Sequence, residues 1–442
     1  MYYSNKNFVL TCLSVFLLNS ANAQQTDNIH LSLADIWAKV TANSKTLQMQ
    51  DFKVLRTLEG IKDAKAERLP EINAEGEYSK ITNLPIYTHG LFHTPDQYEL
   101  PVHTSYSFGG DAYFNLYSGG KVTTKIAEEK KENEIAVAQK NLTTEEIKLR
   151  ATAYYLDLER SRIFKALLLK DISTQEKQLA EINQLLKNGV VLKSDVLRGT
   201  LKLSRQKMSL VQLDNDILIA NQKLNILTGL PDHTVIEPED GDNAELPVLK
   251  SYTAYLDDAM ANSPAYRISE KETQLSKLNI KAIKANGAIK LGLFSNYKYS
   301  YPQILIYPYS IAMYGLGFSG IKASYSISSL YQNRHKVKAA EIQYRQQEVE
   351  HADTEDKIRQ EVNEAFLRYK EALTRIDVAK ENISQATENL RIVNNTYFNQ
   401  LSLITDLLDA DTQLLQTRFD YAAARIAAQL QYYQLQKAIG NL

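Results

Sequence analysis

Two aspartates near the end of the chain have the spacing of a charged ring. Asp406 and Asp409 stand three residues apart in a segment with helical character, so both carboxylates lie on one helix face. In a symmetric oligomer this face would form stacked acidic rings, which favour cations in a pore. In a single chain, aspartates in the first turn of a helix are simply stabilised by the helix dipole. The residue types alone leave both interpretations open.

No other residues combine into a catalytic or metal site. His89 and His93 have the i,i+4 spacing of a metal-binding pair, but they lie between Pro85 and Pro95 in a loop that is not expected to be helical. No glycine-rich phosphate loop follows a strand, and no serine stands in a nucleophile-elbow pattern. The sequence therefore predicts no enzymatic activity, no cofactor and no metal.

The N-terminal segment predicts export. Lys6 supplies a small positive charge, residues 8–18 are apolar but too short to span a bilayer, and residues 21–23 read Ala-Asn-Ala, a signal-peptidase pattern. We predict a signal peptide over residues 1–23. Cys12, the only cysteine, lies inside it, so the mature chain is expected to contain neither disulfides nor thiol chemistry.

Composition narrows the function classes further. The formal net charge is −1 with acidic and basic residues interspersed, so no nucleic-acid partner is predicted. Glycine and proline are scarce, and long stretches contain neither, which is typical of very long helices. After the signal segment no run of 18 apolar residues occurs, so a membrane role must use strands.

The sequence contains an internal repeat. Three motifs recur in the same order: Ala42-Asn43-Ser44 as Ala261-Asn262-Ser263, Ser194-Asp195-Val196-Leu197 as Thr405-Asp406-Leu407-Leu408, and Gly229 as Gly440. Such self-similarity predicts a duplicated unit of about two hundred residues. The first repeat is placed at residues 24–231, a linker at 232–251 and the second repeat at 252–442.

Each repeat predicts the same order of elements. The first contains a helix over residues 31–68, strands over 71–81 and 104–117, a long helix over 120–187 and a helix over 194–228. The second contains a helix over residues 252–286, strands over 288–301 and 313–327, a long helix over 330–399 and a helix over 404–438. A helix of seventy residues is about 100 Å long, far beyond a globular helix.

The residue patterns of the second long helix and of the strands predict which of their faces pack against other elements. The second long helix carries a heptad with small residues at every second core position: Val362, Ala365, Tyr369, Ala372, Ile376, Ala379, Ile383, Ala386 and Leu390. The strands alternate as membrane strands do, and the fourth changes parity, which predicts a bulge near Ser319-Gly320. Four strands cannot close a barrel, and open edges are costly in lipid, so at least two copies must assemble.

This pattern resembles the TolC-like outer membrane factor family over nearly the whole mature chain. Residues 115–121, Asn-Leu-Tyr-Ser-Gly-Gly-Lys, are similar to the family's entry into the long helix, and residues 397–409 are similar to its periplasmic helix-turn-helix. The resemblance implies long α-helices forming a periplasmic coiled-coil tunnel. It also implies four β-strands per chain in a shared trimeric outer-membrane β-barrel, and a periplasmic adaptor and an inner-membrane transporter as partners.

The resemblance also implies roles for individual residues. Tyr397 matches the tyrosine that helps hold the tunnel entrance shut, Asp195 its acidic partner, and Asp406 and Asp409 the constriction ring. The adaptor-docking tips are expected at Gly189, Val190 and Val191 in the first repeat and at Gln400, Leu401 and Ser402 in the second. Ser402 replaces an arginine that bonds across the closed entrance in some members, and Arg198 is a conceivable substitute.

The sequence therefore favours a passive outer-membrane exit channel of a tripartite efflux pump or type I secretion system, anchored in outer-membrane lipid and extending into the periplasm. A soluble periplasmic coiled-coil scaffold is the alternative, since heptads alone would suit it. A secreted enzyme on a helical stalk is the third reading, disfavoured because no catalytic site can be named.

Overall fold

A computed structural model describes residues 28–239, 246–303, 308 and 310–442. The predicted signal peptide and Cys12 lie outside these residues. The elements of the first repeat are β1 (Asn28–Leu31), α2 (Leu33–Asn43), α3 (Lys45–Ala66), β2 (Glu71–Lys80), β3 (Leu84–Ile86), β4 (Asp96–Tyr98), β5 (Thr104–Ser118), α4 (Lys121–Lys187) and α5 (Lys193–Thr228). The rest of the described chain forms β6 (Val235–Pro238), α6 (Tyr252–Asn262), α7 (Pro264–Ala285), β7 (Lys290–Tyr301), β8 (Tyr314–Ser324), α8 (Ser329–Phe398) and α9 (Ile404–Ala438).

The two long helices are confirmed, at 67 residues for α4 and 70 for α8. The helix predicted before the strands of each repeat is instead two helices, broken at Ser44 and at Ser263. Both serines leave the helical conformation, with ψ 117° at Ser44 and 121° at Ser263. Their hydroxyls accept from the backbone amides of Leu47 (3.4 Å) and Tyr266 (3.5 Å). Each serine therefore ends one helix and caps the next.

The repeated Asn-Ser motif and the repeated glycine meet in space. The Asn43 Nδ2 donates to the Thr228 carbonyl at 2.9 Å, and Gly229 ends α5 in the left-handed conformation beside Asn43. In the second repeat Gly440 also has a positive φ, and a Cβ there would lie 2.7 Å from the Asn262 carbonyl oxygen. Only glycine fits this close approach, which explains why both copies carry the same residues at these places.

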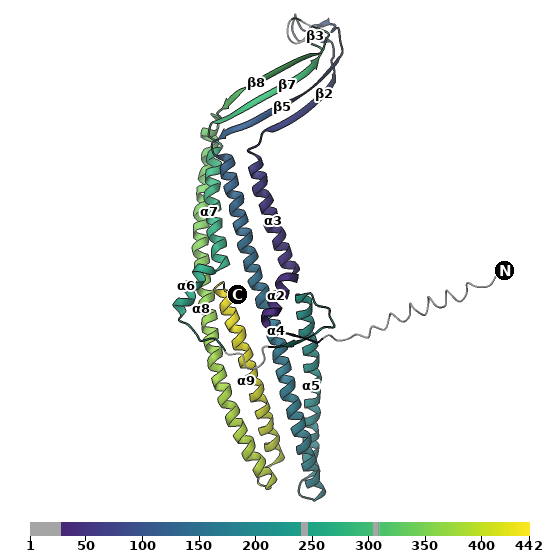
Figure 1. Ribbon diagram of the computed structural model, residues 1–442, viewed down its shortest axis with the longest axis vertical. Coiled ribbons are helices and arrows are strands. Elements are labelled where there is room, and N and C mark those ends of the chain that lie inside the picture. Colours follow the sequence, from purple (N-terminus) through teal and green to yellow (C-terminus); the bar gives the residue numbers. More distant parts are fainter. Residues whose placement is uncertain (1–27, 240–245, 304–307, 309) are drawn as a thin grey trace, which may run out of the picture. The chain divides into compact units, whose positions relative to one another are not determined.

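A four-stranded antiparallel sheet has the order β2-β5-β7-β8, as Figure 1 shows. Stacked rings join neighbouring strands on one face, with centroids 4.8 Å apart for Tyr106 and Tyr301 and 5.1 Å apart for Phe108 and Tyr299. On the other face Lys298 and Glu75 form an ion pair at 3.3 Å across β5. The predicted division into an aromatic face and a polar face is thus present over β2, β5 and β7.

The predicted bulge in β8 is wrong. The β7–β8 register is continuous through Ser319 and Gly320, and the only shift in this sheet falls between β5 and β7 near Asn115. Glycines explain the difference. A Cβ on Gly317 would lie 2.5 Å from the Tyr297 ring, and one on Gly315 would lie 2.6 Å from the Tyr297 hydroxyl, so only glycine leaves room for this tyrosine over β8. The large residues of its first half consequently lie on the polar face.

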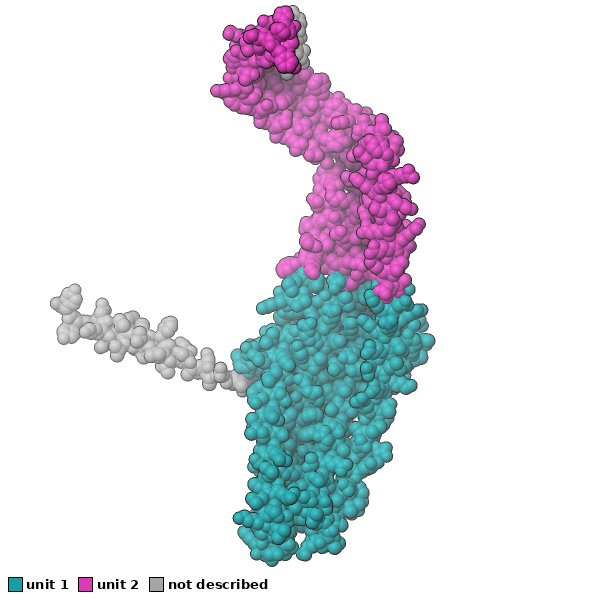
Figure 2. All heavy atoms as spheres, turned by 180° about the vertical axis from the view of Figure 1, so that it is seen from behind, with its two compact units in different colours: residues 1–51, 139–266, 354–442 teal, residues 52–138, 267–353 magenta. Residues whose placement is uncertain are grey.

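Two compact units make up the described chain, coloured separately in Figure 2. Unit 1 comprises residues 1–51, 139–266 and 354–442, and unit 2 comprises residues 52–138 and 267–353. Each unit therefore draws on both sequence repeats. No helix within the described residues is long and apolar enough to cross a membrane.

The core of unit 1 confirms the heptad. One cluster joins α2, α4, α5 and β6 through Ile36, Tyr155, Leu224 and Ile236, all at most 1% exposed. In a second cluster, where α8 and α9 run side by side, Val362 and Tyr369 are fully buried with Leu435. Farther along α8 the small heptad residues Ala372, Ala379 and Ala386 are also buried. Small side chains at these positions allow a close approach of neighbouring helices.

Candidate functional site at the helical turns

The turns α4–α5 and α8–α9 share one backbone geometry. In the first, Gly189 has φ 73°, and the Val190 amide donates to the Leu185 carbonyl at 2.9 Å. In the second, Gln400 has φ 62°, and the Leu401 amide donates to the Thr396 carbonyl at 2.8 Å. Both are helix ends with a residue in the left-handed region, a conformation that glycine adopts freely and glutamine adopts at a cost.

Two of the predicted gate aspartates are helix caps in this chain. The Asp195 Oδ2 accepts from the Leu192 amide at 3.3 Å, and the Asp406 Oδ2 accepts from the Leu403 amide at 3.1 Å. These positions are equivalent in the two repeats, and each carboxylate lies at the positive end of its helix dipole. Asp409 is exposed, and no hydrogen bond or ion pair reaches it from the described residues. The carboxylates of Asp406 and Asp409 are both open to solvent.

Tyr397 occupies the centre of an apolar cluster between the two turns. The cluster joins Ile182 of α4 to Tyr397 of α8 and to Ile404 and Leu407 of α9. Tyr397 is only 6% exposed, and its hydroxyl is buried without a hydrogen-bond partner among the described residues. Burial, and then the negative charge of Asp195, raise the pKa of the Tyr397 phenol. The structure thus brings Tyr397 and Asp195 into electrostatic range.

Ser402 bonds within its own turn. Its hydroxyl accepts from the Thr396 hydroxyl at 3.1 Å and donates to the Val393 carbonyl at 3.5 Å. Arg198, the conceivable substitute for the family arginine, is exposed on α5, and no ion pair reaches it within the described part of the chain. The α8–α9 turn is therefore held by hydrogen bonds of a serine, and no ion pair contributes among the described residues.

A buried polar cluster nearby was missed by the sequence analysis. Asp411 of α9 is 3% exposed, and it accepts from Lys202 of α5 and from Gln175 of α4. The Lys202 Nζ also donates to the Leu408 carbonyl at 2.9 Å. One lysine and one glutamine therefore tie α9 to the α4–α5 hairpin, in a place from which water is largely excluded.

A second carboxylate in this cluster has no cation of its own. Asp171 of α4 is 6% exposed, and it accepts from the Gln206 side-chain amide, whose own oxygen is buried without a partner among the described residues. Burial, and then repulsion from Asp411, raise the pKa of Asp171 to about 6, against smaller opposing effects of Lys202, Gln206 and Arg418. No ion pair reaches Asp171 from the described residues, so its charge is compensated less closely than that of Asp411, which Lys202 contacts directly.

The heptad positions of α4 carried the available signal for buried polar groups. Its apolar line recurs by sevens at Ile135, Leu142, Leu149, Leu156 and Ile163, but the positions three residues later include Thr152 and Glu159. Thr152 is fully buried and accepts from the Trp37 indole at 3.0 Å, and Glu159 is 4% exposed. Glu145, also buried, has its pKa raised to about 7, mainly by burial. Polar residues at core positions of a coiled helix indicate specific interhelical bonds.

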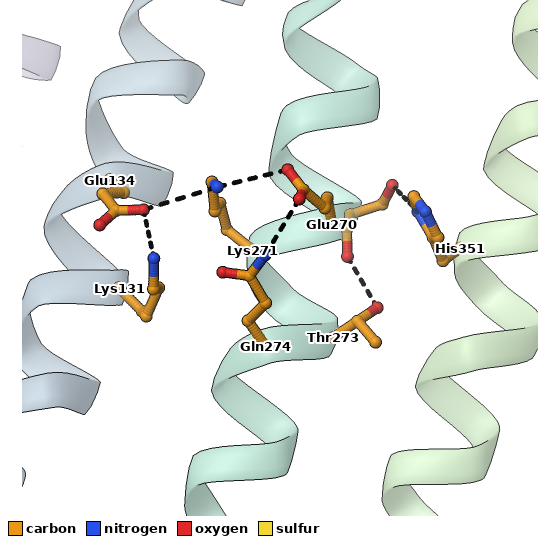
Figure 3. Close-up of polar contacts among 8 residues, drawn as sticks. Lys131, Glu134, Glu270, Lys271, Thr273, Gln274 and His351 are labelled. Atoms are coloured by element: carbon orange, nitrogen blue, oxygen red, sulfur yellow. Dashed lines mark hydrogen bonds and ion pairs between the residues drawn. The ribbon is translucent and has the colours of Figure 1, made fainter. Parts of the chain in front are cut away.

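Unit 2 contains a polar network between α4, α7 and α8 (Figure 3). Glu134 of α4 contacts Lys131 at 2.7 Å and Lys271 of α7 at 3.8 Å. The Ser269 hydroxyl lies 2.7 Å from the His351 Nδ1, but Ser269 is only 6% exposed. A buried serine cannot meet a substrate, so we interpret this pair as a tie between helices.

The histidine pair of the loop does not form a helix. His89 and His93 flank a turn in which Gly90 has φ 93° and its carbonyl accepts from the His93 amide at 3.1 Å. Within the described residues, no three His, Cys, Asp or Glu side chains gather closely enough to hold a metal ion.

Comparisons with known proteins agree with this architecture. The sequence profile of a family described as "outer membrane efflux protein" matches residues 38–230 and 311–441. No curated protein matches the sequence.

Several solved structures share the fold. The channel CusC is 17% identical, with a TM-score of 0.76 over 93% of this chain and 92% of its own. VceC from Vibrio cholerae is 14% identical, with a TM-score of 0.73 over 92% and 96% of the two chains. MtrE of Neisseria gonorrhoeae, solved in an open state, is 17% identical, with a TM-score of 0.71 over 92% and 88%.

Proposed function

The chain belongs to the outer membrane efflux protein family, and we propose that it is the outer-membrane exit channel of a tripartite efflux pump. As a member of this family it is a passive channel and not an enzyme. The proposal places the strands in the outer membrane and the helices in the periplasm. A type I secretion system uses the same kind of duct and is the alternative assembly.

The observation that carries the proposal is the four-stranded sheet. Its outer strands β2 and β8 have no further strand partner among the described residues. On the aromatic face Ile72, Tyr78 and Phe108 are all at least half exposed. An apolar sheet face with open edges suits lipid only if other copies pair with the edges. We propose three copies, which would supply twelve strands.

Native mass spectrometry of the detergent-purified protein tests the assembly. The expected mass is that of three chains, and the protein should leave membranes only with detergent. Release by alkali or high salt alone, or a monomer in detergent, would refute the channel and favour the periplasmic scaffold.

The proposed gate lies at the two turns. The α4–α5 and α8–α9 hairpins pack together through the apolar cluster around Tyr397, and parting them would expose these side chains. Each large apolar side chain contributes about 1.5–3 kcal/mol on burial, so the resting entrance is held mainly by packing. We propose that docking of a periplasmic adaptor at Gly189 to Val191 and at Gln400 to Ser402 shifts this balance.

Single-channel recording in planar bilayers tests the gate. We propose that the Tyr397 hydroxyl, which has no partner among the described residues, and the Asp195 carboxylate bond to neighbouring copies in the closed trimer. The double variant Tyr397→Phe with Asp195→Ala removes these bonds but keeps the packing, and it should raise the conductance of the resting channel. Because the Asp195 side chain also accepts from the Leu192 amide at the start of α5, Asp195→Asn with Tyr397→Phe is the matched variant that keeps this bond while removing the charge. If both double variants conduct like the parent, the pair is not part of the lock.

The acidic ring is tested by ion selectivity. Asp406→Asn with Asp409→Asn should move the reversal potential in a salt gradient towards that of a non-selective pore, because exposed carboxylates in a ring attract cations. Asparagine retains the capping ability of Asp406, so the helix stays intact. Asp420→Asn on the same helix is the control, and equal shifts in both variants would contradict a ring at the constriction.

A further inference from the structure

The second repeat contains a long stretch without acidic residues. From Thr273 to Ala340 no Asp or Glu occurs, although the whole protein carries a net charge of −1. The same stretch contains nine basic residues: Lys277, Lys281, Lys284, Lys290, Lys298, Lys322, Arg334, Lys336 and Lys338. The corresponding part of the first repeat, residues 54–127, contains nine acidic residues. The duplication has therefore diverged in charge at one end.

These cations gather where helices meet strands. Lys281 and Lys284 stand in the last turns of α7, whereas Arg334, Lys336 and Lys338 stand in the first turns of α8. Lys290 and Lys322 lie at the same end of the β7–β8 hairpin, where Lys290 pairs in register with Ser324. All seven are exposed. These seven residues form a positive collar along the β7–β8 side of this end of the sheet.

A groove between α7 and α8 lies within the collar. It has a volume of 790 Å³, and its lining includes Lys284, Arg334, His335 and Lys338. Glu341 is the only acid in the lining, and it pairs with Lys284 at 3.4 Å. No acidic partner reaches Arg334 or Lys338 from the described residues. Two cations thus remain available to an anion.

Exposed apolar side chains border the groove on the strand side. Leu330, itself in the lining, is 65% exposed, and Ile327 and Tyr331 are 71% and 66% exposed. From strand to helix the chain therefore passes from apolar and aromatic residues to basic ones. This order is typical of a membrane interface, where aromatic rings lie at headgroup level and lysine and arginine reach the phosphates.

We propose that this groove binds the phosphate headgroup of an anionic phospholipid, with the acyl chains along the exposed apolar residues. The inference rests on the proposed membrane location of the strands. A free phosphate would use the cations but not the apolar border. A neighbouring copy is less suitable, because Glu59 of α3 and Glu67, which follows α3, are already paired with Lys62 and Lys125 of their own chain.

Native mass spectrometry of the full-length protein in neutral detergent tests the groove, with dioleoyl phosphatidylglycerol as the probe. The variant Lys284→Gln/Arg334→Gln/Lys338→Gln should bind it about a hundredfold more weakly, because each basic residue contributes about fivefold near an anionic surface. The matched control removes three exposed cations from α3, as Lys53→Gln/Arg56→Gln/Lys65→Gln, and should bind as the parent does. Arg334→Lys/Lys338→Arg keeps the charge and should retain binding.

The other probes decide between sources. Phosphatidylcholine should bind weakly to all variants, and glycerol phosphate or inorganic phosphate at millimolar concentration should not displace the lipid. Full displacement by either soluble anion, or equal binding of both lipids, would overturn the proposal. If the triple variant loses its oligomeric mass while each chain retains the lipid, the groove is instead a contact between copies. Oligomeric mass and conductance report the proposed function separately.

Discussion

Replacing Asp171 by asparagine should stabilise the helices around the buried cluster at neutral pH. Asp171 is almost fully buried, and Asp411, the charged group that raises its pKa most, already uses the only lysine of the cluster. Asparagine removes the buried charge and keeps an oxygen that can accept from Gln206. Its amide can also donate to the Gln206 oxygen, which lacks a partner.

The magnitude follows from the pKa of Asp171, which rises from 3.8 to about 6 on folding. The folded chain therefore holds this proton more tightly than the unfolded chain. Its stability falls as the pH rises from about 4 to about 6, and the full cost is present above that window. At 1.36 kcal/mol for each pH unit the cost is about 3 kcal/mol, which residual solvent screening reduces to about 2 kcal/mol.

Amide hydrogen exchange is the appropriate assay because it reports local opening. Peptides covering residues 165–180, 198–210 and 405–415 should exchange about thirtyfold more slowly in Asp171→Asn than in the parent at pH 7.5. At pH 4, where Asp171 is largely protonated in the folded chain, the two proteins should exchange alike. Asp216→Asn, an exposed position on α5, removes the same charge and should change little.

Two results would refute this reasoning. Faster or unchanged exchange in Asp171→Asn at pH 7.5 would mean that the ionised carboxylate is stabilised by its surroundings. An equal difference at pH 4 and pH 7.5 would mean that the effect comes from the new amide and not from the buried charge.

Three further predictions concern the same hairpins. Lys202→Met should destabilise them by about 3 kcal/mol in thermal unfolding, because Asp411 loses its cation, and the double variant with Asp411→Leu should recover most of the loss. Gln400→Gly should stabilise the α8–α9 turn by about 1 kcal/mol in hydrogen exchange, whereas Gly189→Gln should destabilise its counterpart by a similar amount. Glu145→Gln should abolish a loss of stability that the parent shows as pH rises from about 4.5 to about 7, measured by thermal unfolding across this range.

Much of the fold was predictable because its signals are periodic or repeated. The heptad of α8 requires only that Val362 and Tyr369 recur by sevens, and both prove fully buried. The strand boundaries follow from alternation, and β2 and β5 differ from the prediction by one residue at one end. Long uninterrupted helices follow from the absence of glycine and proline.

Local breaks and tertiary compensation were not predictable in the same way. Ser44 interrupts its helix without any glycine or proline, and the motif that contains both serines was recognised only as a marker of the repeat. Ser263 is followed by Pro264, which begins α7, so this second break had a proline signal that the helix predicted over residues 252–286 overlooked. The bulge expected in β8 assumed that large apolar side chains must share one face. The structure instead fills that face with the ring of Tyr297, lying over Gly315 and Gly317 of the neighbouring strand.

The candidate site likewise contains features that the sequence predicts and features that it does not. Spacing placed Asp406 and Asp409 on one exposed helix face, but it could not show that Asp195 and Asp406 serve as helix caps. The cluster around Asp171 and Asp411 escaped notice because its members come from three helices, α4, α5 and α9, the last about two hundred residues farther along the chain. Nothing in the spacing of one helix reveals a buried bond to another.

The α4–α5 and α8–α9 turns share their backbone geometry but differ in the side chains that they expose. The two turns keep the left-handed residue and the capping aspartate, because any helical hairpin of this geometry needs them. Their other side chains differ. The first turn carries Val191 where the second carries Ser402, whose hydroxyl donates to the Val393 carbonyl near the end of α8. A partner that docks at both turns therefore meets two different surfaces on one backbone template. In the proposed assembly of three copies these surfaces would alternate, so an adaptor that docks as we propose would contact two distinct kinds of site.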